Sequence, residues 1–162
     1  MMNIKIMCVG KIKDKHLSSL ISEYQKRISK YAKLEIIEVE DEKISQNLSD
    51  LDIKNIKQKE CNKIIEKINK INKPYIIALD LKGKNLSSIG FSQKLQNISV
   101  NGFSTIIFLI GGSLGISEEL LNKCNDKLCF SALTFPHQLI RLFLCEQIFR
   151  AFKIINNETY HH

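Results

Sequence analysis

The sequence is poor in residues that interrupt regular structure: its 162 residues include only 7 glycines and 2 prolines. So little glycine and proline excludes collagen-like, linker-like and low-complexity chains. Uninterrupted apolar runs, such as residues 106–110, fall far short of the roughly 20 residues that cross a bilayer. No charged-then-apolar leader opens the chain, because Gly10 and Lys11 end its first apolar stretch. We therefore expect a cytoplasmic protein with no membrane segment, and one domain spanning residues 1–162.

Cysteine pairs of the kind that hold metals are also missing. Five cysteines are present, an odd number, and none of them forms a C-x-x-C pair: Cys8, Cys61, Cys124, Cys129 and Cys145. Three lie inside apolar runs, where a thiol behaves as a small hydrophobic group. The four histidines do not stand at zinc-ligand spacing. We expect reduced structural thiols and no metal.

Arginine is scarce, although the chain is basic. The formal net charge is +7 and the pI is about 9.1, which favours an acidic partner, nucleic acid first. Of the 24 basic residues, only Arg27, Arg141 and Arg150 are arginines. Lysine in such excess is also typical of an AT-rich genome, so the charge by itself favours nucleic acid only modestly. Two of the arginines share one C-terminal segment, where the planar guanidinium rather than any positive charge is the expected requirement.

The spacing of apolar residues predicts strands that alternate with helices. Strands are expected at residues 3–9, 34–39, 75–81, 105–110 and 128–130, and helices at 15–31, 51–71, from about 87, from about 117, and at 137–152. Such alternation is typical of β-α-β units around a buried parallel sheet. The sequence therefore predicts a single α/β domain with a mostly parallel sheet and helices on both faces.

The predicted C-terminal helix is apolar around nearly its whole circumference. Its apolar residues are Leu139, Ile140, Leu142, Phe143, Leu144, Cys145, Ile148, Phe149, Ala151 and Phe152. A helix of this kind must be covered on nearly every side. One small protomer covers only part of it, so we expect a homodimer with this helix at a two-fold interface. The alternative is that it crosses one face of the sheet beneath other helices.

A glycine-rich loop, residues 111–115, follows the buried strand at 105–110 and precedes a helix. Open α/β sheets bind ligands at such strand ends. Adjacent glycines let a backbone approach a ligand closely and adopt positive φ. The loop lacks the G-x-G-x-x-G spacing of a dinucleotide site and the Gly-Lys-Ser/Thr of a Walker A loop. A plain tight turn is the alternative interpretation.

A second candidate segment runs from residue 130 to residue 138 and is followed by Arg141. Pro136 suits the first position of a helix, and Thr134 would then be its N-cap. The polar tail at residues 156–162 ends in Tyr160 and two histidines. By itself, a Tyr-His pair near a terminus carries little meaning.

Three stretches together resemble a known family: FLIGGSLG, then LTFPHQLIRLFLCEQIFRAFKI, then the ending TYHH. They are similar to the ribosomal RNA large subunit methyltransferase H family, small members of the SPOUT methyltransferases. The resemblance extends over essentially the whole chain and is most specific from Phe108 onward. It implies a C-terminal trefoil knot, with S-adenosylmethionine bound in the knot between protomers. It also implies methylation of N3 of a pseudouridine in 23S rRNA within the assembled ribosome.

The resemblance also implies site residues. The cofactor-contacting positions are Leu79, Gly111, Phe130, Ser131, Ala132, Leu133, Thr134 and Phe135. The sequence departs from the family pattern at CFSAL, where a Ser and a Met are more usual, and at the final His, where a Lys or Arg is common. Contacts made through the backbone tolerate the first change, and the second weakens a phosphate contact slightly.

Arg141, Tyr160 and His161 are the expected catalytic residues. Methyl transfer is an in-line displacement, so the enzyme must hold nucleophile, methyl carbon and sulfur collinear, and loss of the imide proton must be assisted. Arg141 would stabilise the resulting oxyanion, or simply form a structural salt bridge. Tyr160 or His161 would orient the base or move the proton, and Tyr160 would equally stack on an extruded base.

Two other function classes remain open from the sequence. A non-catalytic RNA-binding module of the same fold would need no cofactor, and the intact glycine loop and TFPHQ segment disfavour it. A nucleotide-binding oxidoreductase is disfavoured by the missing G-x-G-x-x-G and ribose-binding acid.

Overall fold

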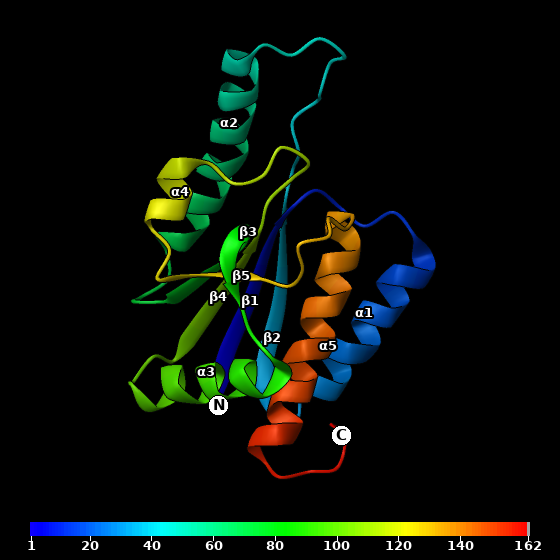
Figure 1. Cartoon of the computed structure of the whole chain (residues 1–162), viewed down its shortest axis with the longest axis vertical. Helices are drawn as coiled ribbons and strands as arrows, with labels where there is room; N and C mark the ends of the chain where they lie inside the picture. Colours follow the sequence, from blue (N-terminus) through cyan, green and yellow to red (C-terminus); the bar gives the residue numbers. More distant parts are fainter. Residues whose placement is uncertain (162) are drawn as a thin grey trace.

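The computed structural model describes residues 1–161. In chain order its elements are β1 (Met2–Val9), α1 (Lys15–Ile28), β2 (Ala32–Val39), α2 (Asp50–Ile68), β3 (Tyr75–Asn85), α3 (Ser88–Val100), β4 (Thr105–Ile110), α4 (Glu118–Asn122), β5 (Asp126–Cys129) and α5 (His137–Ile155). The predicted order of strands and helices is confirmed, with most boundaries moved by a few residues (Figure 1).

The described strands form one five-stranded sheet in the order β2-β1-β4-β3-β5, and every pairing is parallel. The central strand β4 is buried along its whole length, as the apolar run at residues 106–110 predicts for a strand covered on both faces. Because all strands are parallel, their carboxyl ends meet at one edge of the sheet. Loops that follow β1, β3, β4 and β5 are therefore neighbours, although they are far apart in the sequence.

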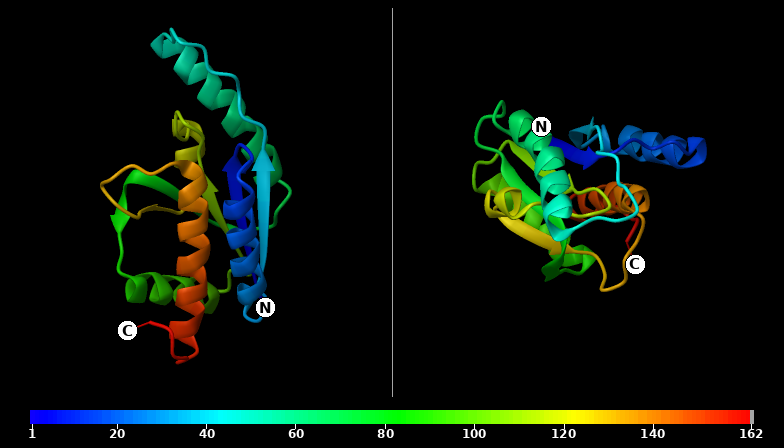
Figure 2. Two further views of the ribbon diagram at one scale, coloured as in Figure 1. Left: turned by 90° about the vertical axis from the view of Figure 1, so that its right-hand side faces the viewer. Right: turned by 90° about the horizontal axis from the view of Figure 1, so that it is seen from above.

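Helices cover both faces of the sheet, as expected. One apolar core joins the sheet to α1, α3 and α5, and a second joins the opposite face to α2 and α4. Figures 1 and 2 show the two layers, with α5 lying across the sheet beside α1 and α3. On α5 the residues Leu144, Cys145 and Ile148 are fully buried against this face. The alternative raised for this helix, that other helices cover it, is therefore correct for its inner side.

Most of the helices have a side-chain N-cap. Asp14, Ser49, Ser87 and Ser117 each accept a hydrogen bond from a backbone N–H in the first turn of α1, α2, α3 and α4 respectively. α5 differs, because its N-cap is Pro136 and no described side chain caps it. The expectation that Thr134 caps this helix, with Pro136 already inside it, is wrong. Pro136 has ψ of 132°, which places it in extended backbone outside the helix.

Strand β3 is longer than the sequence predicts and closes around β5. The glycine-containing segment at residues 82–84, expected as a loop, belongs to this strand. Leu79 and Lys84 both pair with Leu128, so the residues between them bulge around the edge strand. A Cβ on Gly83 would lie 2.7 Å from the Leu128 nitrogen. Only glycine permits such a close approach of two backbones.

The cysteines carry free thiols, and most of them are buried in the α/β fold. All five cysteines are free among the described residues, and burial raises the pKa of Cys8 and of Cys145 to about 12. These thiols therefore stay un-ionised and act as core residues.

Within residues 1–161 no helix is long and apolar enough to cross a membrane, and no group of three acidic, His or Cys side chains is placed to hold a metal ion.

The contact at Gly83 gives a stability prediction. Gly83→Ala should lower the free energy of unfolding by about 1–3 kcal/mol, because the new methyl group overlaps the backbone of β5. Gly90→Ala is the control: Gly90 lies in the first turn of α3, where a helical backbone favours alanine over glycine, and an added Cβ would lie 3.3 Å from Ser87 Oγ rather than 2.7 Å from backbone. Urea denaturation should show a lower midpoint for the first variant and an unchanged or higher one for the second. Equal midpoints for Gly83→Ala and the wild type would contradict the close approach.

Candidate functional site

A cavity of about 410 Å³ lies at the carboxyl edge of the sheet, where the bulge of β3 meets the loops after β4 and β5. Its volume falls in the range of small-molecule sites, about 300–1,000 Å³. Its lining residues include Leu79, Asp80, Leu81, Gly111, Gly112, Ser113, Gly115, Ile116, Phe130, Ser131, Leu133, Thr134, Phe135, His137 and Ile140. The cavity therefore gathers the two loops that the sequence analysis singled out.

The glycine loop after β4 folds back on itself. Gly112 and Gly115 form an isolated antiparallel bridge, and the Gly115 N–H donates to the Gly112 carbonyl at 3.0 Å. Gly115 has a φ of +89°, which accounts for glycine there. Gly111 does not have positive φ; a Cβ on it would lie 2.8 Å from the Gly115 carbonyl carbon. Close approach within the loop, rather than an unusual backbone angle, requires glycine at position 111.

The buried carboxyl group of Glu60 lies close to this loop. Glu60 of α2 is 3% exposed, and a Cβ on Gly112 would lie 3.1 Å from its Oε1. The Glu42 N–H donates to Glu60 Oε2 at 3.0 Å. Burial raises the pKa of Glu60, partly offset by this hydrogen bond. No sequence pattern indicates this contact, because the two residues lie far apart along the chain.

The loop after β5 is held by backbone and side-chain hydrogen bonds. The Leu133 N–H donates to Ser131 Oγ at 3.0 Å. The Asn85 side chain donates to the carbonyls of Cys129 and Phe130, at 3.2 and 3.3 Å. Of the eight predicted cofactor residues, only Ala132 is not among the described residues that line the cavity.

His137, which the sequence analysis did not select, is also in the cavity wall. Burial lowers its pKa, and the nearby Arg141 charge lowers it further. The imidazole is therefore neutral at pH 7 and able to accept a proton or a hydrogen bond. The TFPHQ segment contains the residue, but only the fold shows that it lines the cavity.

Arg141 lies beside the cavity and not in its wall. Its side chain is 1% exposed, and it is not among the described residues that line the cavity. One terminal nitrogen donates to Glu38 Oε2 at 2.7 Å and the other to the Gly10 carbonyl at 3.2 Å. The guanidinium thus connects α5 to the ends of β1 and β2, in line with the salt bridge that the sequence left open.

Tyr160 and His161 lie together along the C-terminal half of α5. The Tyr160 hydroxyl donates to Glu146 Oε1 at 3.2 Å, and its ring packs edge-on against Phe149, with centroids 5.0 Å apart. His161 Nδ1 lies 3.2 Å from an Arg150 nitrogen. Burial, with Tyr24 and Glu146 close by, raises the pKa of Tyr160 to about 12. The phenol therefore stays protonated near neutral pH.

This tail is remote from the cavity of its own chain. The cavity contacts the first residues of α5, whereas the tail returns along the other end of this helix (Figure 1). A helix of 19 residues is about 28 Å long. Within one chain, the structure brings Tyr160 and His161 together but does not bring them to the cofactor residues or to Arg141.

Solved structures share this fold. A probable methylase family protein from Haemophilus influenzae matches with a TM-score of 0.54 and 13% identity, over 99% of this chain and 71% of that one. A tRNA (m1G37) methyltransferase from Aquifex aeolicus matches with a TM-score of 0.51 and 16% identity, over 91% and 69%. At such low identity these matches show the fold alone.

The family model described as "Predicted SPOUT methyltransferase" matches residues 2–161. The chain belongs to the SPOUT methyltransferase family. A Clostridium botulinum protein (strain Kyoto) named ribosomal RNA large subunit methyltransferase H is 53% identical over 160 residues, 99% of each chain. A Clostridium perfringens protein (strain SM101) named ribosomal RNA large subunit methyltransferase H 1 is 50% identical over the same coverage. The resemblance read from the sequence is confirmed.

As a SPOUT methyltransferase, this chain uses S-adenosylmethionine as its methyl donor, and the cavity suits such a molecule. The described lining residues include one carboxylate, Asp80, and no lysine or arginine, so nothing there repels a sulfonium cation. Apolar walls from Leu79, Ile116 and Ile140 suit a flat aromatic base, and exposed loop backbone supplies hydrogen-bonding groups.

The glycine loop gives a binding prediction. Gly111→Ala should lower the affinity for S-adenosylmethionine by about tenfold or more, 1.4 kcal/mol, because the added Cβ forces Gly115 and Ile116 to move. Isothermal titration calorimetry measures the change, and circular dichroism checks that the fold is kept. Gly90→Ala, remote in α3, should bind as the wild type does. Unchanged affinity for Gly111→Ala would mean that the loop is only a turn.

Proposed function

We propose that this SPOUT methyltransferase methylates N3 of a pseudouridine in 23S rRNA of the assembled ribosome. The observation that carries the proposal is the 53% identity, over 99% of both chains, to a protein named ribosomal RNA large subunit methyltransferase H. The net charge of +7 agrees with an RNA substrate. A ribosomal substrate also implies that the enzyme works in the cytoplasm.

The residues predicted for the cofactor have a shared task in this proposal. S-adenosylmethionine supplies an electrophilic methyl group, and the three cavity segments fix its direction of approach. Leu79, Gly111, Phe130, Ser131 and residues 133–135 line the cavity, and they would hold the donor by shape and backbone hydrogen bonds. The neutral imidazole of His137 stands in the same wall. A fixed donor brings the reacting atoms into line, and this positioning lowers the activation barrier of an in-line displacement.

We propose that the active form is a homodimer. Several large apolar side chains near the cavity remain exposed in the single chain: Leu81, Leu133, Phe135, Leu139 and Phe143, with exposures from 36% to 70%. Phe135 and Phe143 pack edge-to-face, with centroids 5.5 Å apart. Leu133 and Phe135 lie in the loop before α5, Leu139 and Phe143 on α5 and Leu81 on β3, and we propose that together they form one apolar surface. A second copy would cover it, whereas the inner side of α5 is already buried.

A homodimer also explains how the predicted catalytic residues would meet. Tyr160 and His161 are held at the far end of α5 from the cavity of their own chain. We therefore propose that the tail of one protomer serves the cavity of its partner, where the protonated Tyr160 stacks on or donates to the extruded base. Arg141 would act through the cavity wall that it holds in place, and through its charge.

The trefoil knot is part of the same proposal. Two features support it: β3 wraps around Leu128 of the edge strand, and the chain then returns from β5 across the sheet as α5. A knot would keep the three cavity segments together without any covalent link.

The experiment that tests the proposed function uses ribosomes from a bacterial strain that lacks this modification. The purified protein and labelled S-adenosylmethionine should transfer one methyl group per ribosome, and mass spectrometry of the rRNA fragments should place it on N3 of a pseudouridine. Methylation at another base, or of no rRNA at all, would overturn the proposal.

The dimer gives its own prediction. Phe143→Asp should shift the mass measured by light scattering from twice 18.6 kDa toward 18.6 kDa, because the charge would be buried at the interface. It should also abolish methylation if both protomers build the site. Leu51→Asp is the control, since Leu51 is 66% exposed on α2, away from this surface. A wild-type mass of 18.6 kDa at micromolar concentration would contradict the dimer.

A further inference from the structure

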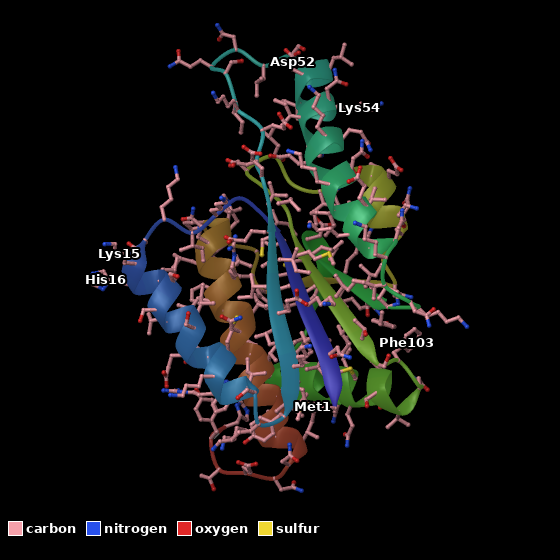
Figure 3. All side chains as sticks on the ribbon, turned by 180° about the vertical axis from the view of Figure 1, so that it is seen from behind. Met1, Lys15, His16, Asp52, Lys54 and Phe103 are labelled. Carbon is pink, nitrogen blue, oxygen red and sulfur yellow. The ribbon has the colours of Figure 1, made fainter. Side chains whose placement is uncertain are left out.

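Residues 11–16 form a basic segment at the same edge of the sheet as the cavity. The segment leaves the end of β1 and runs into the first turn of α1, with the sequence Lys-Ile-Lys-Asp-Lys-His. All three of its lysines and His16 are exposed. Figure 3 shows Lys15 and His16 at the start of α1, directed away from the sheet. These exposed cations therefore lie at the same edge of the sheet as the cavity.

Internal pairing does not account for these charges. Lys11, Lys13 and Lys15 form no ion pair within the described residues, whereas Lys5, Lys63, Lys94 and Lys153 each pair with an acid. The one acid of the segment, Asp14, is occupied as the N-cap of α1 and accepts from the Leu17 N–H at 3.0 Å. Lys15 and His16 also lie in the first turn of a helix, where the dipole disfavours cations.

The base of the segment is held firmly against the cavity wall. Glu38 Oε2 accepts hydrogen bonds from the Ile12 N–H, at 3.2 Å, and from Arg141, at 2.7 Å. Arg141 also donates to the carbonyl of Gly10, the residue before the segment. A Cβ on Gly10 would lie 3.9 Å from Nε2 of His137, which is in the cavity wall. The same ion pair therefore fixes the cavity wall and the start of the basic segment.

We propose that the basic segment, Lys11, Lys13 and Lys15 above all, binds the phosphate backbone of the RNA substrate and sets its position relative to the methyl donor. This inference rests on the proposed function for the choice of RNA. Lysines on mobile stems recognise phosphates as point charges rather than reading bases. The segment therefore contributes affinity and placement, and the cavity contributes the choice of base.

The decisive variant replaces all three lysines, Lys11→Gln, Lys13→Gln and Lys15→Gln. Its control makes the same change of charge on the opposite face of the sheet, with Lys59→Gln, Lys67→Gln and Lys70→Gln on and just after α2, all exposed in this structure. A third protein with arginine at positions 11, 13 and 15 keeps the charge. Co-sedimentation with unmodified ribosomes gives the affinity at 50 to 200 mM salt, and labelled methyl transfer gives kcat and KM.

We expect the decisive variant to bind ribosomes about tenfold or more weakly at low salt, with KM raised in parallel. The slope of log affinity against log salt should fall by about 2 to 3, because each phosphate contact contributes about 0.7–0.9. Affinity for S-adenosylmethionine should stay unchanged, and the arginine protein should bind as the wild type does. The α2 control should stay within about twofold of the wild type.

Three results would overturn the inference: unchanged ribosome affinity in the decisive variant, an equal loss in the α2 control, or failure of the arginine protein to restore binding. The first of these, combined with normal methylation, would leave the proposed function intact. If the wild type bound ribosomes through this segment but methylated no rRNA, the proposed function would fail while the RNA-binding surface would stand.

Discussion

The Arg141 guanidinium, 1% exposed, joins segments that are far apart in the sequence. It bonds Glu38 at the end of β2 and the Gly10 carbonyl after β1, and it belongs to the helix that begins the cavity wall. Arg141 is buried but the Glu38 side chain is 34% exposed, so solvent partly screens the pair, and removing one partner should cost less than the roughly 3–5 kcal/mol of a fully buried pair. The Nε atom of Arg141 has no hydrogen-bond partner in the described part of the chain. The hydrogen bonds of the guanidinium therefore all go to Glu38 and Gly10. The positions of α5, of His137 and of the basic segment therefore depend on one interaction.

Periodicity was sufficient for the architecture of this chain. The alternation of strands and helices, the all-parallel sheet and the cover on both faces follow from where apolar residues recur. The glycine loop after β4 predicted a ligand site at the carboxyl edge of the sheet. The length of β3 was missed, because Lys82 and Lys84 look like loop residues until β5 is seen to pair beside them. The start of α5 at His137 was predicted correctly, but its N-cap is Pro136 and not Thr134.

Residue roles needed the tertiary structure. Nothing near Arg141 in the sequence indicates Glu38, which lies 103 positions away. The requirement for glycine at position 111 comes from its contact with Gly115 and Ile116, not from its own backbone angle. The tail was expected to act in catalysis together with Arg141, but Glu146, Arg150 and Phe149 hold it at the other end of α5. In the proposed homodimer the tail of one chain would serve the cavity of its partner, and periodicity cannot predict such a site because symmetry would supply its second half.

We propose that the bulge of β3 and the loops after β4 and β5, at the carboxyl edge of the sheet, form the S-adenosylmethionine site. Hydrogen–deuterium exchange of the whole protein, with and without saturating S-adenosylmethionine, tests it most directly. We expect slower exchange in residues 79–84, 111–116 and 130–137, and no change in the apolar hollow between α3 and the end of α5 that Leu95, Val100 and Ile155 line. Protection confined to that hollow, or absent from the glycine loop, would contradict the claim.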